Sequence, residues 1–174
     1  MRIRPIAVWC LSALLVAGLA GCGFHLRNND NLPPVMQRTY LVIPGGNNDL
    51  ERELRRNLST ATVSVVTDPA KATATLLILR AQRFRRVLSV NYLGRPVEKE
   101  VAYQVEFSLS TPNGILIKPQ TLTLTRNFAY NEAQVLGDTE QANELYAALQ
   151  RDMAQLILFR VEALNRPAGP TPSH

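Results

Sequence analysis

The stretch that decides the fold is Val101-Ala102-Tyr103-Gln104-Val105-Glu106-Phe107-Ser108-Leu109-Ser110. Its odd-numbered positions are all apolar, and its even-numbered positions are polar apart from one alanine. Successive side chains of a strand point to opposite faces, so this period of two predicts a β-strand with one buried face and one wet face. The buried face of such a sheet needs helices or a second sheet to cover it.

Two further long strands flank this one along the chain. Residues 75–90 begin with an apolar run, and residues 116–130 alternate leucine or phenylalanine with threonine or asparagine. Turn-forming residues separate both segments from the central strand, at 91–95 and at 112–114. We therefore predict an antiparallel meander of three long strands.

Shorter elements complete the predicted domain. Apolar runs at 40–43 and 63–66 predict two short strands, and leucines spaced four apart after Asn48 predict a short amphipathic helix. From Asp138 onward the period becomes helical, and Asp138 with Gln141 has the spacing of a capping box at the start of the helix. The apolar stripe of this helix is formed by Ala142, Leu145, Leu149, Met153, Leu156, Ile157 and Leu164. The predicted fold class is α+β: a mixed, mainly antiparallel sheet of four to five strands with two helices packed on one face.

Arg126 interrupts the apolar face of the last predicted strand. A charged group at such a position needs a partner of opposite sign. We predict a salt bridge from Arg126 to the C-terminal helix, through Glu140 or Glu144.

The N-terminus predicts a lipoprotein signal peptide over residues 1–21. Arg2 and Arg4 precede an apolar run of roughly 15 residues, which is too short to cross a bilayer comfortably and is typical of a cleaved signal. The run ends in Leu19-Ala20-Gly21-Cys22, the order of residues in a bacterial lipobox. We predict that Cys22 is lipidated; the alternative is an ordinary signal followed by a free cysteine. A single domain is expected over 22–165, and a disordered tail over the proline-rich residues 166–174.

The sequence argues against catalysis, metal binding and cofactors. The two histidines are His25, close to the predicted anchor, and His174, the last residue, so neither is expected to face a base or a metal ion. No glycine-rich phosphate loop is present. Acidic pairs such as Glu98 and Glu100 are typical of solvated strand faces. Loss of Arg2 and Arg4 with the predicted signal peptide lowers the formal net charge from +5 to +3. This mild basic excess suits an anionic lipid or saccharide in the cell envelope, and no nucleic-acid partner is expected in that compartment.

Basic residues gather in the second half of one long strand and in the hairpin after it. Arg83 and Arg85 are expected on one strand face and Arg86 on the other. Together with Arg95 and Lys99, the first two could clamp phosphates through bidentate hydrogen bonds. An edge strand kept from aggregating by its charge is the other interpretation.

Several of these stretches resemble the LptE family of lipopolysaccharide-assembly lipoproteins. The resemblance rests on Cys22-Gly23-Phe24-His25-Leu26-Arg27, on Ala102-Tyr103-Gln104-Val105, and on Arg126-Asn127-Phe128-Ala129-Tyr130-Asn131 leading into Glu140-Gln141 and a long helix. It covers the chain from Cys22 to the tail.

The resemblance implies a non-enzymatic protein in the outer membrane. It would be lipid-anchored, would lie on the periplasmic side and inside the lumen of the barrel protein LptD, would plug that barrel one-to-one, and would assist lipopolysaccharide assembly. Arg83, Arg85, Arg95 and Lys99 would be its candidate lipopolysaccharide contacts. Members of the family carry a second group of basic residues just before the last helix, but the corresponding segment of this chain, Leu136-Gly137-Asp138, contains no lysine or arginine. An outer-membrane lipoprotein that binds another anionic envelope ligand without a barrel is the alternative.

Overall fold

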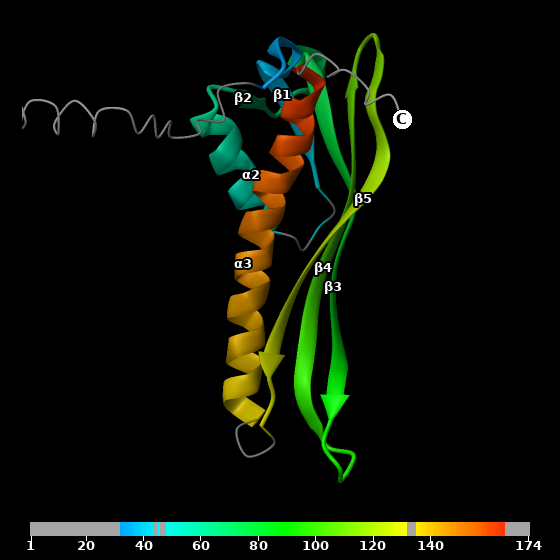
Figure 1. The fold of residues 1–174 in the computed structure, drawn as a ribbon. Helices are drawn as coiled ribbons and strands as arrows, with labels where there is room; N and C mark the ends of the chain where they lie inside the picture. The colour runs from blue at the N-terminus through cyan, green and yellow to red at the C-terminus, as the bar shows by residue number, and fades with distance from the viewer. Residues whose placement is uncertain (1–31, 44, 46–47, 132–134, 166–174) are drawn as a thin grey trace, which may run out of the picture.

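The computed structural model describes residues 32–43, 45, 48–131 and 135–165 (Figure 1). The predicted signal peptide at 1–21, Cys22 and the tail at 166–174 lie outside the described residues. The described elements are η1 (Pro34–Met36), β1 (Arg38–Val42), α2 (Asn48–Thr60), β2 (Ser64–Val66), η2 (Pro69–Lys71), β3 (Ala74–Val90), β4 (Pro96–Thr111), β5 (Gly114–Ala129), α3 (Val135–Glu162) and η4 (Ala163–Asn165).

The strands form one sheet in the order β2-β1-β3-β4-β5. β1 lies parallel to both β2 and β3, whereas β3, β4 and β5 are the predicted antiparallel meander. The predicted mixed sheet and its α+β class are therefore confirmed. β1 pairs with β3 only over Ala74 to Leu77, so beyond Leu77 the described part of the chain gives β3 one strand partner, β4.

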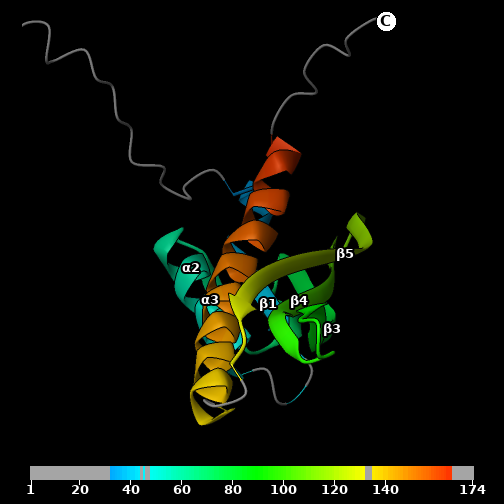
Figure 2. The same cartoon turned by 60° about the horizontal axis from the view of Figure 1, so that its bottom comes forward.

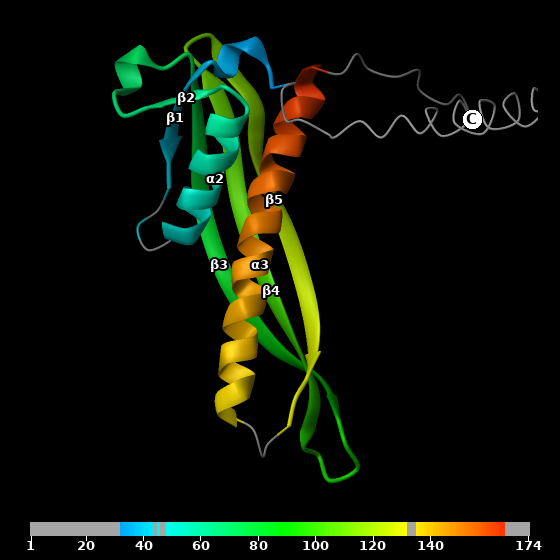
Figure 3. The same cartoon turned by 90° about the vertical axis from the view of Figure 1, so that its left-hand side faces the viewer.

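Both helices cover the same face of the sheet (Figure 3). The odd-numbered residues of β4 from Val101 to Leu109 point to this face and are fully buried, as the alternation predicts. They pack with leucines of α2 and with the buried stripe of α3, including Leu149, Met153 and Ile157. Burial of this side of the sheet is the main apolar contribution to stability.

Two details of the predicted C-terminal helix were wrong. α3 begins at Val135 rather than at Asp138, because the Asp138 carboxylate binds cations of the sheet instead of capping the helix. Leu164, placed in the apolar stripe, lies beyond α3 in η4 and is 43% exposed.

The molecule is elongated, with a wide end and a narrow end. At the wide end lie β1, β2, α2 and the last turns of α3; at the narrow end lie the β3–β4 hairpin and the first turns of α3 (Figures 1 and 3). Figure 2 shows β5 curving toward α3, against which it packs. Within the described residues, no helix combines the length and apolarity needed to span a bilayer.

The other face of the sheet, here called the outer face, is mostly polar. It carries the even-numbered residues of β4, which are paired across β5 with Thr121, Thr123, Thr125 and Asn127. Gln104 Nε2 donates a hydrogen bond of 3.2 Å to Thr123 Oγ1 across this face. The predicted polar face is therefore present, and neither helix covers it (Figure 3).

Candidate functional site

The basic residues of β3 divide between the two faces of the sheet. Arg83 is paired with Tyr103 and Arg85 with Val101, both of which point to the helices, whereas Arg86 is paired with Glu100 on the outer face. The predicted division of these arginines is confirmed. Arg83 and Arg85 consequently lie between the sheet and α3.

Arg83 connects β3 to both helices. Its Nη2 atom donates a hydrogen bond of 3.2 Å to Gln150 Oε1 in α3 and lies 3.7 Å from Asp49 Oδ2 in α2. The guanidinium carbon also lies 5.1 Å from the centre of the Tyr146 ring, within cation–π range. These contacts orient the side chain within the fold.

Tyr146 also protects the edge of β3. Its hydroxyl donates a hydrogen bond of 2.6 Å to the carbonyl oxygen of Phe84, beyond the point where β1 ends. A carbonyl group without a hydrogen-bond partner at the edge of a sheet can pair with a strand of another chain. The hydrogen bond from Tyr146 therefore helps to prevent such pairing along the part of β3 that follows Leu77. This part of β3 carries several arginines and is partly covered by α3. It therefore also fits the interpretation of an edge strand that its charge keeps from aggregating.

Lys99 and Arg85 converge on a buried carboxylate at the start of α3. Lys99 Nζ lies 3.3 Å from Asp138 Oδ2, and Arg85 Nη1 lies 3.8 Å from the same oxygen. The side chains of Lys99 and Asp138 are only 15% and 6% exposed. Lys99 Nζ further lies 3.1 Å from the centre of the Tyr130 ring. This cluster fastens the first turn of α3 to the sheet.

Arg95 lies apart from the other three candidates, in the β3–β4 hairpin at the narrow end. Asn91 organises this turn: its side-chain oxygen accepts hydrogen bonds from the backbone N–H groups of Leu93 and Arg95. Gly94 adopts a φ of 75°, which few other residues tolerate. Tyr92 and Leu93 beside it are 94% and 60% exposed.

Arg126 binds the predicted helix through a different residue. Its Nη2 atom lies 2.9 Å from Asp152 Oδ2, so the prediction of Glu140 or Glu144 was wrong. The sequence pattern showed that Arg126 faces α3, but the curvature of β5 decides which turn of the helix it meets. Both side chains of this pair are about half exposed.

Tyr103 brings an unusual polar group into the core. Burial raises the pKa of this phenol above its ordinary value of 10.0, and the nearby Gln150 and Arg83 only partly oppose the rise. The side chain of Gln150 lies close enough to the hydroxyl to favour its ionised form, yet among the described residues no group meets the hydroxyl with the geometry of a formed hydrogen bond. A buried hydroxyl without a partner lowers stability.

We therefore expect Tyr103→Phe to leave the free energy of unfolding unchanged or to raise it by up to about 1 kcal/mol at neutral pH. Above pH 10.0 the Tyr103 phenol ionises in the unfolded protein but stays protonated in the folded protein, because its pKa is raised there. The free energy of unfolding therefore falls as the pH rises above 10.0. Urea unfolding at neutral and alkaline pH should show a smaller alkaline loss in the variant. A clear destabilisation at neutral pH would contradict the unpartnered hydroxyl.

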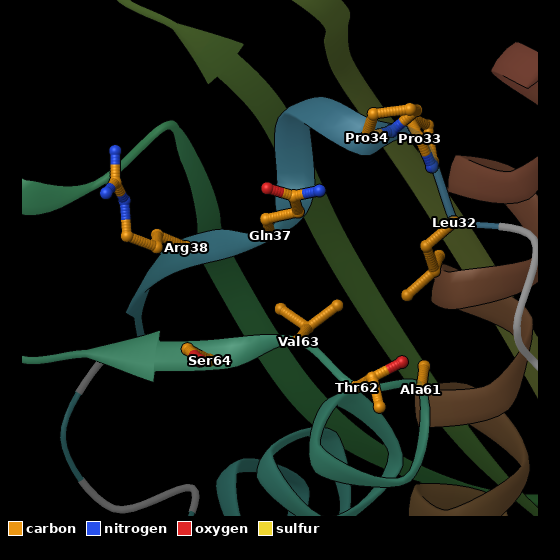
Figure 4. Close-up of a pocket in the computed structure, with 9 residues that line it drawn as sticks. All are labelled: Leu32, Pro33, Pro34, Gln37, Arg38, Ala61, Thr62, Val63 and Ser64. Atoms are coloured by element: carbon orange, nitrogen blue, oxygen red, sulfur yellow. The ribbon is translucent and has the colours of Figure 1, made fainter.

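Hollows occur at two places of functional interest. One, of about 540 Å³, lies at the wide end, where Figure 4 shows Leu32 and Arg38 at its two sides with Val63 between them. It borders the first described residues, and Thr62 beside it has a φ of 57°, rare for a β-branched residue. The other, of about 410 Å³, lies on the outer face around Phe84 and Ala102.

The described ranges contain no cluster of acidic, histidine or cysteine side chains that could hold a metal ion.

Sequence reasoning missed the partners of the predicted cations. Asp49, Gln150 and Tyr146 surround Arg83 and come from two separate helices, so only the tertiary structure brings them together. The helical period could have placed Tyr146 on the same stripe as Leu149. Phe84, an aromatic residue with an even number between Arg83 and Arg85, could have been placed on the outer face by the same alternation.

Comparison with known proteins identifies related sequences. The family model LptE, described as lipopolysaccharide-assembly, matches residues 33–161. "LPS-assembly lipoprotein LptE" from Yersinia enterocolitica is 28% identical over 162 residues, which are 92% of this chain and 77% of that protein. The protein of the same name from Pectobacterium atrosepticum is 26% identical, with 95% and 89% covered.

Solved structures share the fold. An uncharacterised lipoprotein B from Nitrosomonas europaea, determined by NMR, has a TM-score of 0.68 and 34% identity, covering 81% of this chain and 91% of that one. The crystal structure of a minor lipoprotein from Acinetobacter baumannii has a TM-score of 0.65 and 27% identity, with 79% and 100% covered.

Proposed function

The chain belongs to the LptE family of lipopolysaccharide-assembly proteins, and from this premise we propose that it is an outer-membrane lipoprotein that plugs and stabilises the LptD barrel. In this role it forms a one-to-one complex with the barrel and assists transfer of lipopolysaccharide to the outer leaflet. No enzymatic step is part of the proposal. The observation that carries it is the family match, which extends from η1 into the last turn of α3.

The polar outer face supports the position inside a barrel. The lumen of an outer-membrane barrel is lined by water and polar side chains. A sheet face covered by threonine, glutamine and charged groups remains hydrated there, whereas an apolar face would not. The elongated shape is also compatible with insertion along a barrel axis (Figure 1).

Lipidation of Cys22 is the second part of the proposal. Acyl chains on this cysteine would hold the protein at the inner surface of the outer membrane, and two or more chains suffice for stable anchoring. Leu32, the first described residue, lies two residues before η1, which is at the wide end of the fold (Figure 1). The narrow end with its hairpin would then be the end farther from the start of the described chain.

Arg83, Arg85, Arg95 and Lys99 remain the proposed contacts for lipid A phosphates. Three of them already pair with carboxylates of the helices, so a phosphate there would have to compete with Asp49 or Asp138. Arg95 is the first of the four to test, because it is exposed in the hairpin at the narrow end and a ligand can reach it there. Arg95→Ser should weaken salt-sensitive binding of lipid A, whereas Arg38→Ser at the wide end should not; equal binding by both variants would remove Arg95 from the set.

The decisive experiment is affinity purification of the tagged full-length protein from a mild-detergent extract of outer membranes. We expect a heat-modifiable barrel protein to co-purify in a one-to-one ratio. Cys22→Ser should leave the membrane fraction, while a variant with Cys10→Ser, inside the predicted signal peptide, should stay in it. Purification without any barrel would contradict the plug and favour a lipoprotein that binds another anionic envelope ligand.

A further inference from the structure

An aromatic residue interrupts the polar part of the outer face that β3, β4 and β5 form beyond the end of β1. Phe84 is 47% exposed and belongs to the part of β3 that pairs only with β4 among the described strands. Its cross-strand neighbour is Ala102, whose own neighbour in β5 is Thr125. One large side chain therefore stands beside two small ones, and this row borders the hollow of about 410 Å³. We call this row, with the hollow, the Phe84 shelf.

Polar rows flank the Phe84 shelf on both sides. The register places Gln82, Gln104 and Thr123 in the row on one side. In the row on the other side it places Arg86, Glu100 and Asn127. These rows offer amide, hydroxyl, guanidinium and carboxylate groups, all able to donate or accept paired hydrogen bonds.

The charged pair in the second row is held in place. Arg86 Nε donates a hydrogen bond of 2.7 Å to Glu100 Oε1, and the Glu100 side chain is only 11% exposed. Gln104 is likewise fixed by its bond to Thr123. Polar groups oriented before a ligand arrives cost less entropy when it binds.

From this arrangement we infer that the Phe84 shelf is a saccharide-binding site. The negative face of an aromatic ring attracts the C–H groups on the apolar face of a sugar ring, and the flanking rows can bond its hydroxyl groups. The hollow has the volume typical of small-ligand sites. An acyl chain fits less well, because the charged side chains of Arg86 and Glu100 and the hydroxyl groups of Thr123 and Thr125 also line the hollow.

This inference deepens the proposed function and rests on it only for the source of the saccharide. A protein that handles lipopolysaccharide meets sugar rings attached to the lipid, and the shelf would contact that part rather than the lipid A phosphates. A neutral glucan would present the same ring chemistry. The test therefore uses two probes, the lipid-free core oligosaccharide of lipopolysaccharide and maltohexaose.

The experiment measures binding of each probe to the detergent-solubilised full-length protein by saturation-transfer NMR and calorimetry. Phe84→Ala should weaken binding about tenfold, the scale of one lost aromatic contact. Ala102→Leu, which fills the hollow and removes no group, should abolish binding. Tyr92→Ala removes an aromatic side chain from the exposed hairpin and is the matched control, expected to bind as the unaltered protein does.

Binding of either probe with this variant pattern supports the site, and the preferred probe identifies the source. The inference is overturned if neither probe binds, or if Phe84→Ala and Ala102→Leu bind like the unaltered protein. It is also overturned if these variants bind both probes normally but no longer co-purify with the barrel, since the barrel protein would then be the partner that contacts the Phe84 shelf. Co-purification of the barrel with the unaltered protein, measured in parallel, keeps the proposed function standing when the saccharide site fails.

Discussion

Phe107→Ala should lower the free energy of unfolding by about 4 kcal/mol, a large share of the roughly 5–15 kcal/mol that stabilises a folded domain. Phe107 is fully buried on the helix-facing side of β4 and belongs to the core formed with both helices. Truncation removes the transfer free energy of the ring and leaves a cavity that the surrounding strands cannot fill. Denaturant unfolding followed by circular dichroism measures the loss.

The matched control is the same substitution on the opposite face of the same sheet. Phe84 is 47% exposed, so Phe84→Ala should cost less than about 1 kcal/mol. The contrast tests which face the helices cover. Equal losses for the two variants would mean that the outer face is also packed, contrary to the fold described above.

Lys99→Met should destabilise the protein by about 3 kcal/mol. The substitution keeps most of the side-chain volume but leaves the Asp138 carboxylate, 6% exposed, with only Arg85 at 3.8 Å as a described partner of opposite charge. Breaking one side of a buried ion pair is costly because the remaining charge stays desolvated. Thermal and urea unfolding should both report the change.

Two further variants separate this cause from general damage. Lys99→Met combined with Asp138→Leu removes both charges and should recover most of the lost stability. Arg126→Met breaks the half-exposed pair with Asp152 and should cost less than about 1 kcal/mol. If the double variant were no more stable than Lys99→Met alone, the Lys99–Asp138 contact would not be the source of the loss.

Local patterns predicted the secondary structure and the faces of the long strands. The alternation from Val101 to Leu109 placed the core residues of β4 correctly, because the strand period depends only on neighbouring residues. The same rule placed Arg83 and Arg85 on one face and Arg86 on the other. Strand order was not available from any local pattern, since β1 reaches its place between β2 and β3 only through tertiary packing.

The candidate site was predictable in its residue types but not in its contacts. The alternation showed where Arg126 points, yet the turn of α3 that it meets depends on the curvature of β5 (Figure 2). The start of α3 was missed because Asp138, a good capping residue by type, has its carboxylate engaged by Lys99 and Arg85. Contacts between distant segments depend on the assembled fold, which spacing along the chain does not encode.

The length of the β3–β4 ladder sets the reach of the protein. A strand of 17 residues extends roughly 55 Å at the usual rise, whereas a bilayer with its headgroups is about 45 Å thick. A molecule held by its wide end and aligned with the membrane normal would carry Tyr92 and Leu93 from one leaflet's surface to the other. In the orientation proposed above, the length of the ladder would therefore place the hairpin at the membrane surface opposite the wide end.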